Sequence, residues 1–441
     1  MNFFFILILL FFIQGCSFDN KSGVWKNEST YSNKNDDIFK DFKSINIANR
    51  SFQKTIPIKS DFKFPEISSV VNYNWNDIYY NQNNNLPNFS FSEKYNLIFK
   101  SKKVTKYKVN EHILFEDNNA ILTDSRGNII LFSINENKLI SKYNFYKKKY
   151  KKINKKLYKK IENDILYVFD NLGYFYAFNY KQNKILWAQK HDVAFQSNVK
   201  IYKEKIIISD QNNRLYFINK KTGEKLAEIP TEETVIKNNF ENNLSLDSKL
   251  LFYINTFGSL YLVNAENMKI LWFINLNQSL NLNPRNIFVG SEIINYDDKI
   301  LISSNENTYV INQNTGSTLY KKNFASDLKP IIINKNFFTI TKNKFLIAMN
   351  TDTGKIIYSY DLNRKIADFL NTKKKQINIK NFMILEGKIV IFLKNSYILI
   401  FNINGNLQQV KKLPSKINTL PIIIDKSILY LDQKNRISIL N

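Results

Sequence analysis

A repeated strand–turn–strand–turn–strand unit occupies this chain from about Ile121 to its last residue, Asn441. At least seven copies can be aligned, and each holds short apolar and β-branched runs bounded by Asn, Asp, Gly and Lys. Such runs are typical of antiparallel strands, and helical periodicity is hard to find. The spacing is irregular but lies near the ~40–50 residues of one four-stranded propeller blade. Well-preserved copies begin at Ile165, Ile206, Leu250 and Ile300.

Two turns recur inside the unit. The first has the pattern Asp-x-x-Gly, as in Asp124–Gly127, with Asn in place of Gly at Asn213 and Asn435. The chain has only 11 Gly in 441 residues, so Asn is expected to take many of the left-handed positions that hairpins need. The second turn reads Thr-Gly in three copies and is degraded to Gln182-Asn183 and Asn267-Met268 in two others. Four residues after its second position, several copies have an aromatic residue. We expect these aromatic residues to pack between neighbouring blades; they are Trp187, Trp272, Tyr320 and Tyr358.

The last copy lacks its outer strand, and a matching strand pattern occurs upstream at Leu97–Lys102, with Phe99 at the aromatic position. A strand from there would complete the final blade and remove the open sheet edges. The predicted fold is therefore all-β: an eight-bladed β-propeller of four-stranded antiparallel blades, with the ring closed by an N-terminal strand. Without that strand the count is seven, and the residues alone leave both numbers open.

These units resemble the quinoprotein-type (PQQ-like) propeller repeat, and the resemblance covers nearly all of residues 95–441. It implies the architecture, since one fold hosts many functions.

The N-terminus is typical of an exported lipoprotein. Phe3–Ile13 is an unbroken apolar run with the length of a signal-peptide core, and it leads into Ile13-Gln-Gly-Cys16. We expect residues 1–15 to be a signal peptide and Cys16 to be lipidated. Cys16 is the only cysteine, so the chain has no internal disulfide. The polar residues 16–60 are expected to form a flexible tether, and residues 61–441 the propeller, with Phe62–Phe91 laid against it.

This combination of features resembles the BamB family of outer-membrane assembly lipoproteins. The resemblance implies a scaffold without catalytic activity, held on the outer membrane by its lipid and facing the periplasm. Its partners would be the periplasmic domains of BamA and other outer-membrane assembly components. The corresponding contact loops would be Glu232–Phe240, with Val235, Ile236 and Lys237, and Asn283–Glu292, with Arg285 and Glu292.

No catalytic, cofactor-binding or metal-binding residues are predicted. Quinone-dependent propeller enzymes use adjacent cysteines and a Ca²⁺ site, and here His112 and His191 are isolated from any cluster with metal-ligand spacing. Asp297-Asp298 reads as an ordinary acidic turn. Two alternatives remain open: a periplasmic PQQ-dependent dehydrogenase, and a propeller that binds envelope polysaccharide.

The net charge of +25 would suit nucleic acid or an anionic surface, but an exported lipoprotein is not expected to meet nucleic acid. The densest basic cluster, Lys147–Lys160, is expected in a loop between two blades. That loop is either simply solvated or a contact for anionic lipid headgroups or an acidic partner.

Overall fold

The computed structural model describes residues 16–18, 25–27, 52–147, 150, 152–234, 240–277, 288–304 and 306–441. The chain separates into two units, Met1–Arg50 and Ser51–Asn441. In the first unit, β1 (Cys16–Phe18) pairs with β2 (Trp25–Asn27) in antiparallel fashion. The expected signal peptide, residues 1–15, lies outside the described residues, as do residues 19–24 and 28–51 of the expected tether.

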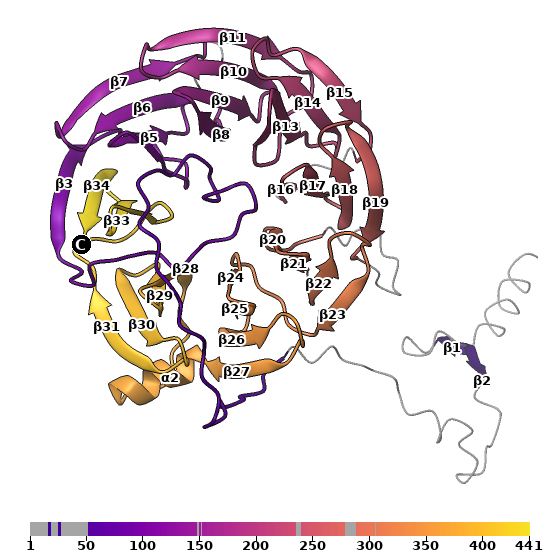
Figure 1. Ribbon diagram of the computed structural model, residues 1–441, viewed down its shortest axis with the longest axis vertical. Coiled ribbons are helices and arrows are strands. Elements are labelled where there is room, and N and C mark those ends of the chain that lie inside the picture. Colours follow the sequence, from indigo (N-terminus) through magenta and orange to yellow (C-terminus); the bar gives the residue numbers. More distant parts are fainter. Residues whose placement is uncertain are drawn as a thin grey trace, which may run out of the picture. The chain divides into compact units, whose positions relative to one another are not determined.

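The second unit is a ring of eight four-stranded antiparallel sheets, which confirms the predicted propeller (Figure 1). We number the blades along the chain, so that blade 1 is β4–β7, blade 7 is β28–β31, and blade 8 has the order β3-β34-β33-β32.

Each blade contributes one strand to each of four concentric layers. The inner strands are β4 (Leu114–Glu116), β8 (Leu157–Glu162), β12 (Lys200–Tyr202), β16 (Asn243–Asp247), β20 (Ile294–Tyr296), β24 (Ile331–Ile333), β28 (Ile379–Leu385) and β32 (Ile422–Ile424). The second strands are β5 (Asn119–Thr123), β9 (Ile165–Asp170), β13 (Lys205–Ser209), β17 (Leu250–Ile254), β21 (Lys299–Ser303), β25 (Asn336–Ile340), β29 (Lys388–Leu393) and β33 (Ser427–Leu431). The third strands are β6 (Asn128–Ser133), β10 (Tyr174–Asn179), β14 (Leu215–Asn219), β18 (Ser259–Asn264), β22 (Thr308–Asn312), β26 (Phe345–Asn350), β30 (Tyr397–Asn402) and β34 (Arg436–Leu440). The outer strands are β7 (Lys138–Asn144), β11 (Lys184–Lys190), β15 (Lys225–Ile229), β19 (Lys269–Asn275), β23 (Thr318–Lys322), β27 (Ile356–Asp361), β31 (Leu407–Lys412) and β3 (Leu97–Lys103).

The core lies between the blades. Each blade lies between two neighbouring blades, which cover both faces of its sheet. Its second and third strands are therefore buried along most of their length, as in β9 (ILYVFD) and β17 (LLFYI). This two-sided burial explains why the sequence shows continuous apolar runs rather than strict alternation.

The ring closes through β3. This strand pairs antiparallel with β34, with Leu97 opposite Leu440 and Phe99 opposite Ile439. The half-buried ring of Phe99 also packs against Phe132 of blade 1, with ring centroids 6.4 Å apart. The N-terminal strand is therefore the outer strand of the eighth blade, as predicted.

The recurring turns have the expected chemistry. The carboxylate of Asp124 accepts hydrogen bonds from the backbone N–H groups of Arg126 (3.0 Å) and Asn128 (3.2 Å). The left-handed position is held by Gly127 at φ 80° and, in other blades, by Asn213 at φ 71° and Asn435 at φ 56°. Asn therefore replaces Gly at these turns, as the composition predicted.

In the blades that have it, the aromatic residue after the second turn joins its blade to the next. Trp187 donates its indole N–H to the carbonyl of Lys220 (2.9 Å), and Trp272 donates to Gln313 (3.1 Å). A Cβ added to Gly223 would lie 2.5 Å from the ring of Trp187. The Thr-Gly turn is thus a seat for the neighbouring blade's aromatic ring, which confirms the prediction.

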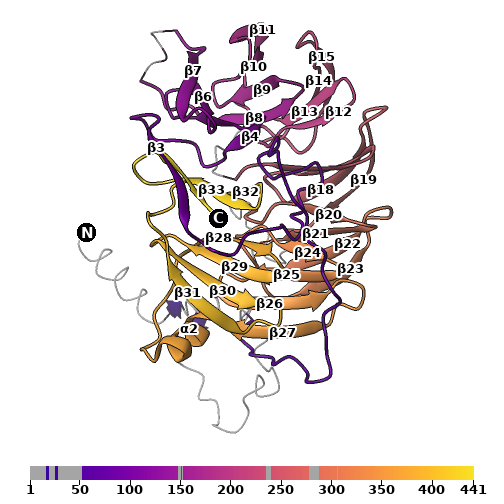
Figure 2. The ribbon, with the colours of Figure 1, turned by 60° about the vertical axis from the view of Figure 1, so that its left-hand side comes forward.

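One helix was not foreseen. α2 (Leu362–Leu370) follows β27, begins with Asp361 as its N-cap, and ends at Asn371 in the left-handed conformation. Figures 1 and 2 show it against β27 and β31. Nine residues make only about two and a half helical turns, which is too short a stretch for helical periodicity to stand out among the surrounding strand patterns.

The basic cluster Lys147–Lys160 is not a loop throughout, and that prediction was wrong for its second half. Residues 157–160 are part of inner strand β8, and Lys155, Lys159 and Lys160 are all buried. Lys159 donates to the carbonyl of His112 (2.9 Å) and to the Thr123 hydroxyl (2.8 Å). The long lysine side chains reach hydrogen-bond acceptors inside the ring. A prediction based only on the density of basic residues therefore placed them wrongly in a loop.

Candidate functional site

The N-terminal stretch of the second unit fills the centre of the ring. Asn72–Phe89, which we call the channel segment, runs inside the propeller (Figure 1) and hydrogen-bonds to the innermost strand of every blade in chain order, starting from blade 8. The contacts, in order, are Asn72 with Ile423 (2.8 Å), Trp75 with Phe115 (2.7 Å), Asn76 with Ile161 (2.9 Å), Gln82 with Ile201 (2.8 Å) and Leu246 (2.9 Å), Asn83 with Asn295 (3.1 Å), Asn85 with Ile332 (2.8 Å), and Phe89 with Ile384 (3.0 Å). The central channel is therefore occupied by the protein's own chain.

A buried ion cluster fixes this segment. One carboxylate oxygen of Asp77, which is 1% exposed, accepts from Lys160 Nζ (2.8 Å) and from Lys200 Nζ (2.9 Å). Lys200 also donates to the carbonyl of Asn81 (2.8 Å) and to Asn84 Oδ1 (2.7 Å). Burial opposes ionisation of Asp77, but the attraction of the two ammonium groups outweighs it and holds the pKa of Asp77 well below its usual range. Burial lowers the pKa of Lys200 to about 7.

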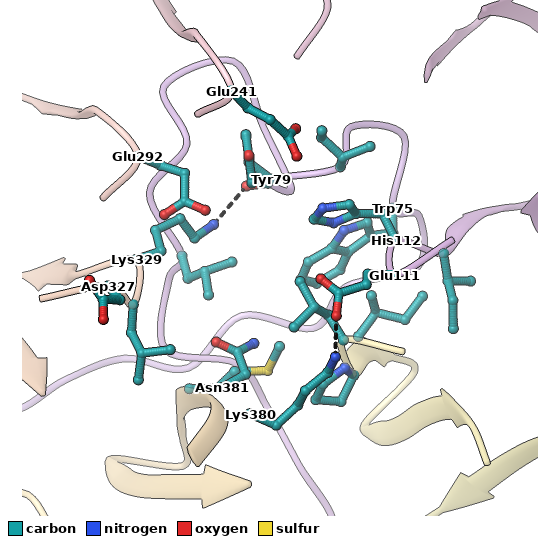
Figure 3. A pocket seen from close by; sticks show the side chains of 18 residues that line it. Trp75, Tyr79, Glu111, His112, Glu241, Glu292, Asp327, Lys329, Lys380 and Asn381 are labelled. Atoms are coloured by element: carbon teal, nitrogen blue, oxygen red, sulfur yellow. Dashed lines mark hydrogen bonds and ion pairs between the residues drawn. The ribbon is translucent and has the colours of Figure 1, made fainter. Parts of the chain in front are cut away.

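Above the channel segment lies an axial pocket of about 240 Å³ (Figure 3). Its floor is formed by channel-segment residues, among them Trp75 and Tyr79. Its walls come from residues at or just before the inner strands of blades 1, 4, 5, 6, 7 and 8. These include Glu111, His112, Glu241, Glu292, Asp327, Lys329, Lys380 and Asn381.

The charges in the axial pocket are largely matched. Glu111 is ion-paired with Lys380, and Glu241 with Lys156. Lys329 donates to the backbone carbonyl of Tyr79 (3.1 Å), its Nζ lies 5.5 Å from the centre of the Tyr79 ring, and Figure 3 shows Glu292 beside it. These pairings leave a mixed-charge surface rather than a strongly acidic or basic one.

Burial perturbs the groups around this pocket. It lowers the pKa of Lys329 to about 8, with nearby Glu292 opposing the shift. It also lowers the pKa of His112 to about 4 and raises the pKa of Glu292. For Glu111, burial alone would raise the pKa, but the hydrogen bond and charge of Lys380 lower it. Such shifts mark a candidate site without identifying a reaction.

The pocket does not fit a quinone cofactor with its metal. Glu111 and Glu241 are already paired with lysines, and the channel segment takes up the centre of the ring. Within the described ranges, no group of three or more His, Cys, Asp and Glu side chains is placed to hold a metal ion. The pocket lining offers polar and charged contacts.

The structure locates some of the residues predicted from sequence. Glu292 lines the axial pocket, and its Oε2 is buried without a hydrogen-bond partner among the described residues. Val235, Ile236, Lys237 and Arg285 lie outside the described residues. The two predicted loops nevertheless lead directly to Glu241 and Glu292 on the pocket wall. Cys16 lies in β1.

Sequence reasoning missed most of the pocket. It recognised the aromatic residues of the channel segment but not the role of its Asn residues, whose amides bond to strand backbones. It dismissed His112, which lies over Tyr79 with ring centroids 5.6 Å apart. The acidic turn was read correctly: Asp298 pairs with the adjacent Lys299 (2.6 Å).

Comparisons with known proteins agree with the propeller. The family model of the outer membrane protein assembly factor BamB matches residues 125–360. No curated protein matches the sequence. The solved structure of BamB from Moraxella catarrhalis is similar at a TM-score of 0.61 and 11% identity, covering 77% of this chain and 99% of that one.

Two dehydrogenase structures are about as similar. A europium-containing methanol dehydrogenase has a TM-score of 0.61 at 11% identity, covering 83% of this chain and 89% of its own. The quinohemoprotein alcohol dehydrogenase from Comamonas testosteroni has a TM-score of 0.58 at 10% identity, covering 83% and 80%. At such identities the structural likeness establishes the fold alone.

Proposed function

Because the chain belongs to the family of the outer membrane protein assembly factor BamB, we propose that it is a scaffold without catalytic activity in outer-membrane β-barrel protein assembly. The proposed partners are the periplasmic domains of BamA and other components of that assembly. The family match is the observation that carries this proposal, because the solved structures, at 10–11% identity, support only the shared fold.

The partner would bind the face around the axial pocket. Candidate loop 232–240 is followed in the chain by Glu241, and candidate loop 283–292 ends at Glu292; both glutamates line this pocket. The proposed contact residues are Val235, Ile236, Lys237, Arg285 and Glu292. Apolar residues beside charges suit a small protein interface, where a few central residues carry most of the binding energy.

Absence of catalysis is part of the proposal and has structural support. A dehydrogenase of this fold needs room for a quinone and a metal, and here the chain's own Trp75 and Tyr79 form the floor of a small pocket. The lysine partners of the carboxylates further reduce their value as metal ligands. A scaffold needs neither an open channel nor a free carboxylate set.

The proposed location is the outer membrane, facing the periplasm, through lipidation of Cys16. The described residues include no helix long and apolar enough to span a membrane. Labelling with a radioactive fatty acid should mark the wild-type protein and not Cys16→Ala. Equal labelling of both would remove the anchor from the proposal.

The test of the scaffold role is co-purification. The full chain, tagged at its C-terminus and extracted from envelopes in mild detergent, should bring BamA with it. Ile236→Asp combined with Lys237→Glu should abolish this while leaving the unfolding temperature nearly unchanged. Lys203→Glu, at an exposed residue outside these loops, is the matched control and should retain BamA. Absence of BamA with the folded wild-type chain would refute the proposal.

A further inference from the structure

The propeller already pairs one of its outer edges with an extended segment. Ile56 and Ser359 of outer strand β27 exchange backbone hydrogen bonds, 2.9 Å from Ile56 N–H and 2.8 Å from Ser359 N–H. On either side, Phe52 packs against Phe324 (5.8 Å between ring centroids) and Ile58 N–H donates to the Tyr360 hydroxyl (3.0 Å). The last part of the expected tether thus covers the edge of blade 6, which shows that an outer strand here accepts an added strand.

Most other outer strands carry a charge that discourages such pairing. An edge strand exposes a row of unpaired backbone groups, and charged side chains are a common protection against unwanted partners. β11 (KILWAQK) has lysines only at its two ends, and the five residues between them are uncharged. The interior charged residues of the remaining protected strands are Lys100 and Lys102 in β3, Lys142 in β7, Glu228 in β15, Lys321 in β23 and Lys411 in β31.

β19 is different, because it has no charge after its first residue and reads KILWFIN. Ile270 is 40% exposed, Leu271 53% and Phe273 62%. Phe273 stacks on Tyr261 with ring centroids 5.5 Å apart, which holds the ring in place on the surface. Figure 1 shows β19 on the outside of the ring. The Lys269 N–H donates to Asn267 Oδ1 (3.2 Å). From Ile270 to Asn275, the backbone forms no hydrogen bond beyond its pairing with β18 among the portions of the chain that the structure describes.

We propose that the outer edge of β19 binds an extended, amphipathic strand of another polypeptide by adding it to blade 4. Backbone hydrogen bonds would provide affinity, and Leu271 and Phe273, which project on the same side of the strand, would select apolar side chains at alternate positions. Trp272 points the other way and is held by blade 5 through Gln313. This site lies on the outer wall, apart from the axial pocket, so it goes beyond the BamA contact.

The charge of the chain favours a different polypeptide over a second copy. Two copies would each bring a net charge of +25, and like charges of this size oppose association. An incoming strand that is neutral or acidic on its polar face meets no such repulsion, and Lys269 at the start of β19 would favour acidic residues near one end.

The test uses the full chain and a dye-labelled peptide of about ten residues, the length of a long strand, in which Val and Tyr alternate with Thr and Asp. Fluorescence anisotropy should show saturable binding, and hydrogen exchange should show new protection within residues 270–274. Phe273→Lys or Leu271→Lys should weaken binding about tenfold or more. Both side chains are exposed, so folding should be unaffected, and circular dichroism would verify this.

Two controls sharpen the result. Leu186→Lys places the same charge on β11, where Leu186 is 45% exposed, and should leave binding unchanged. A peptide with Pro at every polar position lacks the N–H donors and should not bind. The proposal is overturned by equal binding to Phe273→Lys, by protection appearing elsewhere, by no binding at about millimolar peptide, or by self-association that Phe273→Lys removes.

Discussion

Replacing Asp77 by Asn should destabilise the propeller strongly and in a pH-dependent way. The substitution keeps the shape and an acceptor oxygen for the Tyr79 N–H (2.9 Å), but it removes the charge that Lys160 and Lys200 share. Both ammonium groups bond to the same carboxylate oxygen, so they lie close together. Two such charges about 5 Å apart repel by about 3 kcal/mol at an effective dielectric constant of about 20.

The expected loss at pH 6 is therefore about 3–5 kcal/mol, the range found when one partner of a buried ion pair is removed. At pH 9 the loss should be smaller. The pKa of Lys200 is already lowered to about 7, so Lys200 can give up its proton there and end the repulsion. The loss of stability in Asp77→Asn should thus shrink as the pH rises from 6 to 9.

The assay is urea-induced unfolding of the purified chain, followed by tryptophan fluorescence and circular dichroism at both pH values. Glu266→Gln removes an exposed carboxylate paired with Lys203 at 2.7 Å and should cost less than about 1 kcal/mol. Adding Lys200→Met to Asp77→Asn should restore part of the loss at pH 6. A loss below about 1 kcal/mol, or one of equal size at both pH values, would refute this account of the cluster.

Three further predictions concern stability. Burial lowers the pKa values of Lys159 and Lys200 to about 7 and that of Lys329 to about 8. The unfolded chain keeps these protons up to about pH 10. Between pH 7 and 10 the unfolded chain therefore binds more protons than the folded one, and the urea midpoint should rise with pH. Burial raises the pKa values of Tyr79 and Tyr358, so above about pH 10 the trend should reverse, and a flat profile from 7 to 10 would contradict this linkage. Phe99→Ala should cost about 1–3 kcal/mol, less than a fully buried ring, with Lys100→Ala near zero as its control. Gly223→Ala places a Cβ 2.5 Å from Trp187 at φ +76° and should cost about 2–3 kcal/mol of stability. Gly387→Ala, at φ +69° with nothing within 4 Å of the added Cβ, should cost only about 1 kcal/mol. Equal costs would argue against the packing of Trp187 on Gly223.

Local chemistry made most of the fold predictable. Turns such as Asp124–Gly127 fix their own geometry within a few residues, and eight repetitions turned a weak signal into a clear one. The closing strand was found because Phe99 matched the same pattern.

The channel segment and its pocket depend on contacts that no local pattern encodes. Asn85 meets Ile332 across 247 positions of sequence, and an Asn-rich stretch has the composition of a linker. Lys159 and Lys160 looked solvated because a sequence does not show which lysines find buried acceptors. The site was therefore predicted only where the family resemblance supplied it.

The channel segment also has a consequence for how the chain folds. Its bonding partners extend from Phe115 to Ile423, so it cannot complete its contacts until every blade has formed. The earliest part of the domain to be synthesised is thus among the last to reach its final place, and its pairings span almost the whole sequence. Contacts between residues so far apart make folding slow. Complete unfolding must break the hydrogen bonds between the channel segment and all eight inner strands. We therefore expect the native ring to unfold slowly once it has closed.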